Sequence, residues 1–392
     1  MAKKSKRDPT REVSRMFDYK EPRQKLYALM QERGIDLIFL PKHSADLDYL
    51  TGTERRVVTF GNVAYTHHWV AGAFLHPNFD PHFVLPRMIV EFDSPNGVDT
   101  NTTTVSELDD AFAKFSQVAK KFGPVKRIAV SARTWSETMI NLIKVFPDAE
   151  IVNAEEVVNR LRRIKSPQEI ALMTKACHLV DGVLDNVKGR VLAGTAELDL
   201  KSEINFQMNN LGSKTESFDT AVWSMGPKNK RDASDRRTSN AIEGGMGVSF
   251  DFGSVIDGYC ADFGRTIHVG DPSKEYETVY KLVMDAQAAG IAAVKPGVLA
   301  SEVHKATRDV IVEGGYGDWF RHRTGHCIGL DVHEYPYISE EDDTPLEVGM
   351  TFTIEPSVFW PGRVGVRVED IIVVEENGGR KINEFTTDLI AN

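Results

Sequence analysis

Four acidic residues in the second half of the chain stand where alternating apolar residues predict two β-hairpins. Asp251 follows the alternating run GVSF, and Asp262 lies on the strand expected to return from the next turn. Glu355 and Glu369 are placed in the same way in a second hairpin, with Arg367 beside the latter. Successive side chains of a strand point to opposite faces, so the apolar residues separate from the acids. Carboxylates are rarely buried in such strands unless they are paired or bind metal.

A loop with three histidines separates the two hairpins. It runs from 321 to 334 and carries His322, His326 and His333 among flanking glycines. Four carboxylates and one imidazole form an oxygen-rich ligand set with a single nitrogen, which suits Mn, Fe, Co or Zn better than a tetrahedral thiolate site. Two such ions about 3.5–4 Å apart, bridged by carboxylates and a hydroxide, generate a nucleophile at neutral pH. The pattern therefore favours a dinuclear metal site over a set of surface salt bridges.

The composition indicates an acidic, globular protein. The chain has 392 residues, of which 41% are hydrophobic, and 57 acidic against 47 basic residues give a formal net charge of −10. This length favours two domains, and the apolar fraction is sufficient for packed cores. The acid excess argues against nucleic acid as a partner, because phosphate binding needs a basic surface. No run of about 18 apolar residues is present, so no membrane span is expected.

The N-terminal segment and the cysteines favour a cytoplasmic protein. Residues 1–17 are basic and no apolar segment follows them, so we expect a disordered tail rather than a secretory signal. The three cysteines have neither the spacing of a disulfide framework nor that of a zinc ribbon. Such cysteine usage suits a reducing compartment.

Helix and strand patterns place the acids in the larger of two domains. A first α/β domain is expected at 18–158, with helices and strands at 21–33, 35–40, 71–75, 82–85, 108–122 and 127–131. The second domain, at 159–392, opens with a helix at Ser166-Pro167, since proline is tolerated in a first helical turn. It continues with strands at 246–252 and 259–269, helices at 274–294 and 299–313, and strands at 350–356 and 364–374.

Together these motifs resemble the pita-bread metallopeptidase family, which includes methionine aminopeptidase, aminopeptidase P and prolidase. The motifs occur in the family's order: Asp251-Phe-Gly253, Tyr259-Cys-Ala-Asp262-Phe-Gly-Arg265-Thr266, Thr324-Gly-His326, His333-Glu334-Tyr-Pro336, Ile354-Glu355-Pro356 and Val366-Arg367-Val-Glu369-Asp370. The resemblance implies an α+β protein in which a C-terminal pita-bread domain follows a smaller α/β creatinase-type N-terminal domain. The segment from Arg163 to Glu169 looks like the start of the catalytic domain in prolidase-like members. Methionine aminopeptidases usually lack the N-terminal domain, so the proline-specific branch is expected.

The resemblance also implies a role for each residue of the site. Five residues would hold two divalent ions, with manganese as first choice and iron, cobalt or zinc as alternatives: Asp251, Asp262, His326, Glu355 and Glu369. Glu355 would also act as general acid and base. His322 and His333 would line the substrate pocket. One of them would hold the scissile carbonyl or the tetrahedral intermediate, and the other would shuttle protons or bind the substrate. Arg367 would orient Glu369 and its neighbours. The implied partners are a small peptide or amide substrate and a second copy of the chain.

One segment departs from the family pattern. Family members usually carry a histidine shortly before the first metal-binding Asp, and here Asp232 or Ser234 occupies that place. The surrounding loop is basic, with Lys228, Lys230, Arg231, Arg236 and Arg237. Arg231 and Asp232 are therefore candidate substrate-binding residues in a pocket for an acidic group, while a solvated loop is the simpler explanation of the same charges. Cys327 stands where the family favours glycine.

Three hypotheses for the function follow. The leading one is a dinuclear hydrolase of Xaa-Pro dipeptidase or aminopeptidase type, in which a metal-held hydroxide attacks the carbonyl and Glu355 relays the proton. The alternative keeps the fold and the metals but performs non-peptidase chemistry, as a small-molecule C–N hydrolase or a lyase, because the usual histidine is missing. The third is a binding protein without catalysis, which the five retained ligands disfavour.

Overall fold

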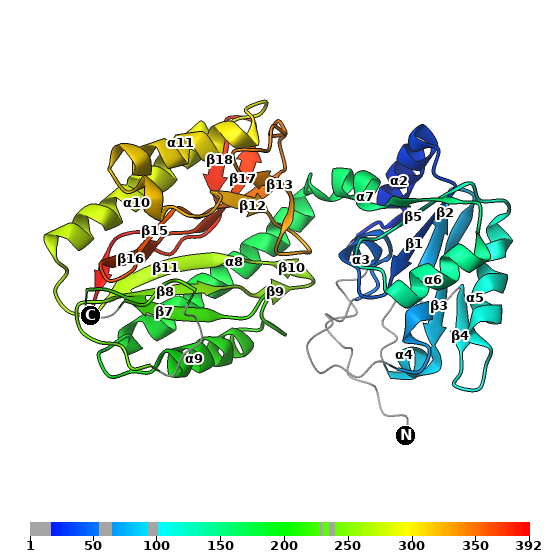
Figure 1. Ribbon diagram of the computed structural model, residues 1–392, viewed down its shortest axis with the longest axis horizontal. Coiled ribbons are helices and arrows are strands. Elements are labelled where there is room, and N and C mark those ends of the chain that lie inside the picture. Colours follow the sequence, from blue (N-terminus) through cyan, green and yellow to red (C-terminus); the bar gives the residue numbers. More distant parts are fainter. Residues whose placement is uncertain (1–16, 55–64, 93–100, 228–229, 235–239) are drawn as a thin grey trace, which may run out of the picture. The chain divides into compact units, whose positions relative to one another are not determined.

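The chain forms two compact units, Met1–Arg162 and Arg163–Asn392 (Figure 1). This computed structural model describes residues 17–54, 65–92, 101–227, 230–234 and 240–392. The sequence patterns predict the change of domain at 158/159. Of the tail expected at 1–17, residues 1–16 lie outside the described part of the chain. Among the described helices, none is both long and apolar enough to cross a membrane.

A six-stranded mixed sheet forms the N-terminal unit. Its strands are β1 (Leu37–Pro41), β2 (Gly72–His76), β3 (Phe79–Pro86), β4 (Thr102–Val105), β5 (Arg127–Val130) and β6 (Glu150–Asn153), in the order β4-β3-β2-β1-β5-β6. One face carries α2 (Lys20–Arg33), α3 (Ala45–Thr51) and α7 (Glu155–Arg162), and the other carries α5 (Ala111–Ala119) and α6 (Ser136–Val145). Alternate residues of β1 serve the two cores: Ile38 and Leu40 pack on the first face, and Leu37 and Phe39 on the second.

The elements expected in this unit are present, but several short ones escape prediction. The helix expected at 108–122 is α-helical only over α5 and ends in a 3-10 turn. The elements without a sequence signal are β4, β6, α3, α4 (Arg87–Phe92) and α6. No side chain caps the start of α6, so the residue pattern that usually marks a helix N-terminus is missing there.

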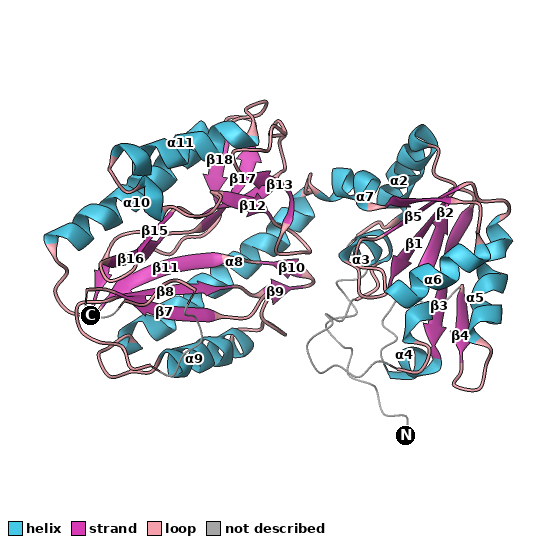
Figure 2. Ribbon diagram, in the orientation of Figure 1, coloured by secondary structure: helices cyan, strands magenta, loops and turns pink. Residues whose placement is uncertain are grey.

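Two main sheets form the C-terminal unit, with helices packed beside them (Figure 2). The first contains β7 (Ala221–Met225), β8 (Gly247–Phe252), β11 (Phe263–His268) and β19 (Ile390–Ala391), near α8 (Pro167–Val187) and α9 (Glu197–Asn210). The second contains β12 (Gly325–Cys327), β13 (Glu334–Ile338), β14 (Thr351–Ile354), β17 (Asp370–Glu375) and β18 (Gly378–Lys381), near α10 (Lys274–Ala293) and α11 (Ala300–Glu313). Two small hairpins complete the unit, β9–β10 (Val255–Ile256, Tyr259–Cys260) and β15–β16 (Ser357–Trp360, Val364–Arg367).

The hairpins that carry the acids are interrupted near the acids, which differs from the continuous strands predicted. The return strand expected at 259–269 divides into β10 and β11 at Ala261-Asp262. The second pair divides at Glu355-Pro356 and at Val368-Glu369, so that β14 pairs with β17 while β15 pairs with β16. Proline has no N–H to donate to a strand ladder, which explains the break at Pro356. The chain thus leaves the large sheet at Glu355 and returns to it at Glu369.

One buried arginine, Arg265 in β11, ties the two main sheets to the C-terminal segment. Its side chain is 1% exposed, and all five of its N–H donors have acceptors. The acceptors are the carbonyl oxygens of Gly264, Glu369, Phe385 and Thr386 and, at 2.7 Å, Asp370 Oδ1. Asp370 Oδ2 accepts a further hydrogen bond from Gln287 of α10 at 3.0 Å. The start of β17 is therefore held in a fixed position beside β11.

Replacing Arg265 by methionine should lower the free energy of unfolding by about 3–5 kcal/mol, because the buried Asp370 carboxylate would lose its closer ionic partner. The ion pair that remains, with Lys381 Nζ 3.7 Å from Asp370 Oδ2, is longer and partly exposed. Arg265→Lys should recover only part of this loss, since one ammonium group cannot reach five acceptors in a planar array. Urea denaturation of each variant measures the effect.

Arg380→Met is the matched control for this experiment. The ion pair between Arg380 and Glu375 is about half exposed on both sides, and such pairs contribute about 0–1 kcal/mol. Equal losses of stability in Arg265→Met and Arg380→Met would contradict the role assigned to Arg265.

Candidate metal centre

Three buried carboxylates meet beside β11. One carboxylate oxygen from each of Asp251, Asp262 and Glu369 lies within 4.8 Å of the other two. Gly264 brings two of these acids together, because it pairs with Asp251 across β8 and β11 and forms a bridge with Glu369 on its other side. A Cβ atom at Gly264 would lie 2.6 Å from Glu369 Oε2. Only glycine leaves room for this approach.

A histidine and a fourth carboxylate adjoin the cluster. His326 Nε2 lies 3.4 Å from Asp262 Oδ2 and 3.5 Å from Glu355 Oε1. The other ring nitrogen, Nδ1, lies 3.2 Å from Cys327 O. Donation from Nδ1 to this carbonyl leaves Nε2 as the nitrogen that can bind a metal. The structure thus brings together the five residues that the family resemblance implies as ligands.

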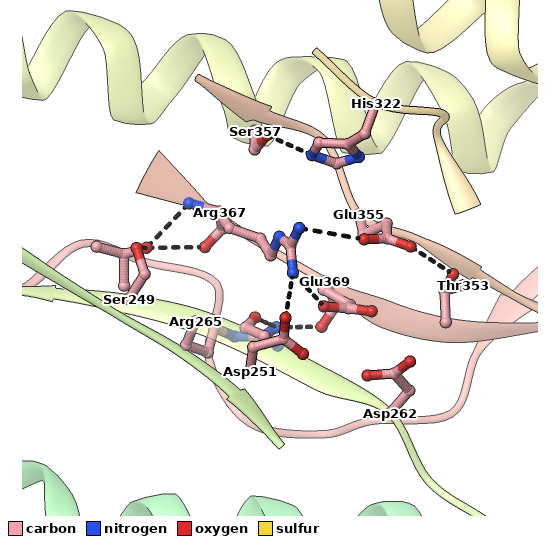
Figure 3. Close-up of polar contacts among 12 residues, drawn as sticks. Ser249, Asp251, Asp262, Arg265, His322, Thr353, Glu355, Ser357, Arg367 and Glu369 are labelled. Carbon is pink, nitrogen blue, oxygen red and sulfur yellow. Dashed lines mark hydrogen bonds and ion pairs between the residues drawn. The ribbon is translucent and has the colours of Figure 1, made fainter. Parts of the chain in front are cut away.

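Arg367 places a positive charge among these carboxylates (Figure 3). Its Nη1 lies 2.6 Å from Asp251 Oδ2 and 3.8 Å from Glu369 Oε2, and its Nη2 lies 3.5 Å from Glu355 Oε2. The Thr266 hydroxyl accepts a hydrogen bond from Arg367 N–H at 2.9 Å and donates one to Arg367 C=O at 3.1 Å. Among Glu369 and the neighbours that it is expected to orient, Arg367 therefore contacts Asp251 most closely.

The cluster carries more buried negative charge than the arginine can offset. Burial raises the pKa of Glu369 well above its usual range, and the nearby Asp262 and Glu355 charges add to the effect. Burial also raises the pKa of Asp262 to about 6, against the opposing hydrogen bond with His326. Asp262 Oδ1 and Glu369 Oε2 are buried without a hydrogen-bond partner among the described residues. Buried oxygens of this kind are the donors that a divalent cation needs.

Neighbouring charges act in the opposite direction on Glu355 and His326. Burial alone would raise the pKa of Glu355, but Arg367 and His326 lower it overall. Burial would lower the pKa of His326, but its hydrogen bond with Asp262 and the charge of Glu355 raise it overall. The Thr353 hydroxyl, 3.2 Å from Glu355 Oε1, further supports the charged form of that carboxylate.

The cluster forms one wall of a cavity of about 900 Å³, which His322 also lines. His322 Nδ1 lies 2.7 Å from Arg323 O, and Nε2 lies 2.6 Å from Ser357 Oγ. A carbonyl can only accept, so Nδ1 carries the proton and Nε2 accepts from the hydroxyl. Burial, reinforced by the charge of Arg367, lowers the pKa of His322 to about 4. The ring is therefore neutral at pH 7.

His333 lines the same cavity from the loop that precedes β13. Its ring centroid lies 4.1 Å from that of His326. Partial burial, with the neighbouring His326 and Arg323, lowers the pKa of His333 to about 4. Two neutral imidazoles, His322 and His333, thus face the space in front of the carboxylates.

The segment that departs from the family pattern divides between the cavity and the sheet beneath it. Asp232 forms two hydrogen bonds with the guanidinium of Arg321, a residue that lines the cavity. Arg231 is instead bound to the fully buried carboxylate of Glu197, with Nη2 2.9 Å from Oε2, and to the hydroxyl of Ser224. Of the predicted substrate-binding pair, Asp232 therefore reaches the cavity through Arg321, and Arg231 anchors the segment.

Two other predicted features have simpler outcomes. Of the basic loop residues, Lys228, Arg236 and Arg237 lie outside the described part of the chain, and Lys230 is exposed. Ser234, the other candidate for the place of the missing histidine, is also exposed. Cys327 is fully buried, and burial raises the pKa of its thiol to about 12. A protonated, buried thiol packs as a small apolar group rather than acting as a metal ligand.

Sequence reasoning named Arg265 and Thr266 only as parts of a motif and gave no role to them, to Ser357 or to Arg321. Arg265 binds the backbone of Glu369, and Thr266 binds that of Arg367. Ser357 holds the ring of His322, and Arg321 pairs with Asp232. A partial signal existed for the hydroxyls, since Ser249 and Thr353 share strand faces with Asp251 and Glu355. Ser249 Oγ lies 2.9 Å from Thr266 Oγ1, and Thr266 in turn binds the backbone of Arg367. Polar residues on the buried face of an apolar strand are thus part of the support for the ligands.

Two family models match the chain, one on each unit. Residues 171–376 match the model of metallopeptidase family M24, and residues 22–164 match that of the creatinase/prolidase N-terminal domain. An uncharacterized peptidase of Bacillus subtilis is 38% identical over 70% of this chain and 77% of its own length. A Xaa-Pro dipeptidase of Pyrococcus furiosus is 29% identical over 95% of this chain and 100% of its own length.

The fold is likewise shared with solved structures. A dipeptidase from Pyrococcus horikoshii superposes with a TM-score of 0.84 at 31% sequence identity, covering 95% of this chain and 100% of that structure. The family matches and this superposition confirm the expected α+β architecture, in which a pita-bread domain follows a creatinase-type N-terminal domain along the chain. The chain belongs to metallopeptidase family M24 and is a hydrolase of that family.

Proposed function

We propose that the chain hydrolyses the amide bond of small Xaa-Pro peptides with two divalent metal ions. The proposed ligands are Asp251, Asp262, His326, Glu355 and Glu369. One observation supports this most directly: a surplus of buried carboxylates, two of them with an oxygen that has no hydrogen-bond partner within the described residues, lines one cavity. Relatives named Xaa-Pro dipeptidase support the proline specificity.

The donor atoms fit a pair of hard or borderline divalent cations. Four carboxylates supply oxygen and His326 supplies one nitrogen, a set that manganese, iron, cobalt and zinc all accept. We propose manganese because the site is dominated by oxygen. Bound here, such ions would supply Lewis-acid activation of a water molecule and of the substrate carbonyl.

Glu355 is the proposed general acid and base. Its carboxylate is ionised at pH 7, since Arg367 and His326 lower its pKa overall. It lines the cavity, where Thr353 holds Oε1 and Arg367 lies beside Oε2. From this position it can accept a proton from the attacking water and deliver it to the leaving amine. Arg367 orients Glu355 and Asp251 during these transfers.

His322 and His333 are proposed to bind the substrate as neutral imidazoles. Ser357 and the backbone hold the His322 ring, so its orientation is set before the substrate arrives. A hydrogen-bonding group that is held in position in this way can stabilise the carbonyl group of the substrate as its carbon becomes tetrahedral. Asp232 would act on substrate binding through its ion pair with Arg321 at the cavity wall.

Non-peptidase chemistry at the same metal site is the second candidate function. The observation in its favour is that Asp232, paired with Arg321, stands where family members carry a histidine. An arginine at the cavity wall could bind an acidic group on a small molecule.

We also propose that the active form is a homodimer, which sedimentation analysis can test.

Removing the metal should abolish hydrolysis and lower the melting temperature, because a ligand that binds only the folded chain stabilises it. Manganese at about 100 times its Kd should add about 2.7 kcal/mol to the free energy of unfolding. Elemental analysis should find about two ions per chain, and fewer in Asp262→Asn and Glu369→Gln. A chain that binds no manganese at saturating concentrations would overturn the proposed centre.

Glu355→Gln should reduce kcat by about 10²–10⁴-fold, since the amide cannot accept the proton. Steady-state kinetics on an Xaa-Pro dipeptide measures this, with the metal content determined in the same sample. Loss of activity that tracks loss of metal alone would assign Glu355 to binding rather than to proton transfer.

Metal-loaded protein should cleave Xaa-Pro dipeptides with a kcat of about 1 per second or more, the usual range for enzymes. The assay should include longer Xaa-Pro-Yaa peptides and small non-peptide amides as alternatives. If only the non-peptide amides react, the second candidate function is correct and the peptidase proposal is wrong.

A further inference from the structure

We propose that the buried ion pair between Lys165 and Glu334 positions His333 in front of the metal-binding cluster, which makes Lys165 a positioning residue for the reaction. This inference rests on the proposed function, because it gives His333 a place in substrate binding. Lys165 belongs to the segment from Arg163 to Glu169 that opens the catalytic unit. The chemistry described above uses no residue of that segment.

Both members of the ion pair are buried. Lys165 Nζ lies 2.9 Å from Glu334 Oε2, and the two side chains are 1% and 8% exposed. Removing both charges from water is costly, so a pair of this kind contributes little to stability compared with well-packed apolar residues. What it does provide is a fixed direction for two side chains.

The backbone around Lys165 is itself held rigidly. Lys165 N–H donates to Gly349 O at 2.9 Å. The next residue, Ser166, caps α8: its Oγ accepts from Glu169 N–H, and Glu169 Oε2 accepts from Ser166 N–H at 2.7 Å. A capping box fixes the entry of the chain into a helix. These hydrogen bonds therefore fix the backbone position from which the Lys165 side chain extends.

Glu334 uses both of its oxygens to hold the loop that carries His333. Oε2 accepts from Lys165, and Oε1 accepts from Asp331 N–H at 3.1 Å. Gly329 packs directly on the pair, since a Cβ atom there would lie 2.8 Å from Lys165 Cε and 2.9 Å from Glu334 Oε1. The ion pair thus supports the loop that carries His333.

The orientation of His333 depends on this support because its own ring has few contacts that fix it. Exposed and buried residues alternate from His333 to Pro336, so His333 and Glu334 point to opposite sides of the chain. Within the described residues, no hydrogen bond fixes the His333 ring, which contacts the ring of His326. Fixing Glu334 on one side therefore sets the direction of His333 on the other.

The test replaces the ion pair without leaving a buried charge. Lys165→Met with Glu334→Gln removes both charges, keeps the side-chain volumes, and retains an oxygen for Asp331 N–H. We expect metal content and melting temperature to stay near those of the wild type, and kcat on an Xaa-Pro dipeptide to fall about 10–100-fold, the cost of a small misplacement. The single variant Lys165→Arg, which keeps a positive charge opposite Glu334, should retain most of the activity.

The decisive readout is the coupling with His333. In a His333→Ala background, adding the double replacement should cause no further loss of kcat, because residues that act through one group are not additive. Arg163→Met is the matched control: its ion pair with Glu347 is partly exposed and lies two residues along the same segment. Full additivity with His333→Ala, or equal losses in Arg163→Met, would overturn the inference.

A readout independent of activity separates this inference from the proposed function. The imidazole NMR signals of His333 in the protein loaded with zinc, which is diamagnetic, should shift in the Lys165→Met/Glu334→Gln variant and not in Arg163→Met. If the wild type cleaves no Xaa-Pro peptide, the proposed function fails, and the NMR comparison alone decides on positioning. If the wild type cleaves them and His333 keeps its signals and kcat in the double variant, only the positioning inference fails.

Discussion

Repulsion among four buried carboxylates is the constraint around which the catalytic unit is arranged. Asp251, Asp262, Glu355 and Glu369 are each less than a tenth exposed, and Arg367 is the guanidinium placed among them. Burial, together with the charges of the neighbouring carboxylates, raises the pKa values of Asp262 and Glu369. A fold that keeps these groups together must hold them by rigid backbone on every side until a cation offsets their charge.

That rigidity comes from the meeting of two sheets. Gly264 permits β11 to approach the backbone of Glu369 closely, and Arg265 then binds the carbonyl of Glu369 and the carboxylate of Asp370. Strand breaks lie at Glu355-Pro356 and at Val368-Glu369, and both glutamates line the cavity together with Asp251 of β8.

Family membership identifies the two domains, whereas the local structure around the cavity concerns substrate binding and the position of the histidines. The family match establishes a metallopeptidase domain and its N-terminal partner domain. Asp232 pairs with Arg321, which lines the cavity, and Lys165 pairs with Glu334 beside the loop of His333. In the roles proposed above, the first pair acts on substrate binding and the second on the geometry of the histidine loop. Peptide cleavage and small-molecule chemistry would therefore differ at the cavity wall rather than at the metal ligands.

The sequence alone indicated the candidate site residues and most of the longer elements. Alternation along β8 and β14 placed Asp251 and Glu355 opposite apolar residues, because the period of a strand is local and needs no knowledge of the fold. The ordered motifs then identified the family and its two domains. Short elements such as β4 and α6 stayed hidden, since they lack capping or alternation strong enough to detect.

Tertiary structure alone decided how the acids meet and what holds them. Lys165 and Glu334 are 169 residues apart in sequence, and Arg265 and Asp370 are 105 apart, so no local pattern could pair them. The strand breaks beside Glu355 and Glu369 depend on which sheet each neighbouring segment joins, a choice made by packing rather than by propensity. The sequence therefore indicated the proposed ligands, and the meeting of two sheets decided how they are arranged.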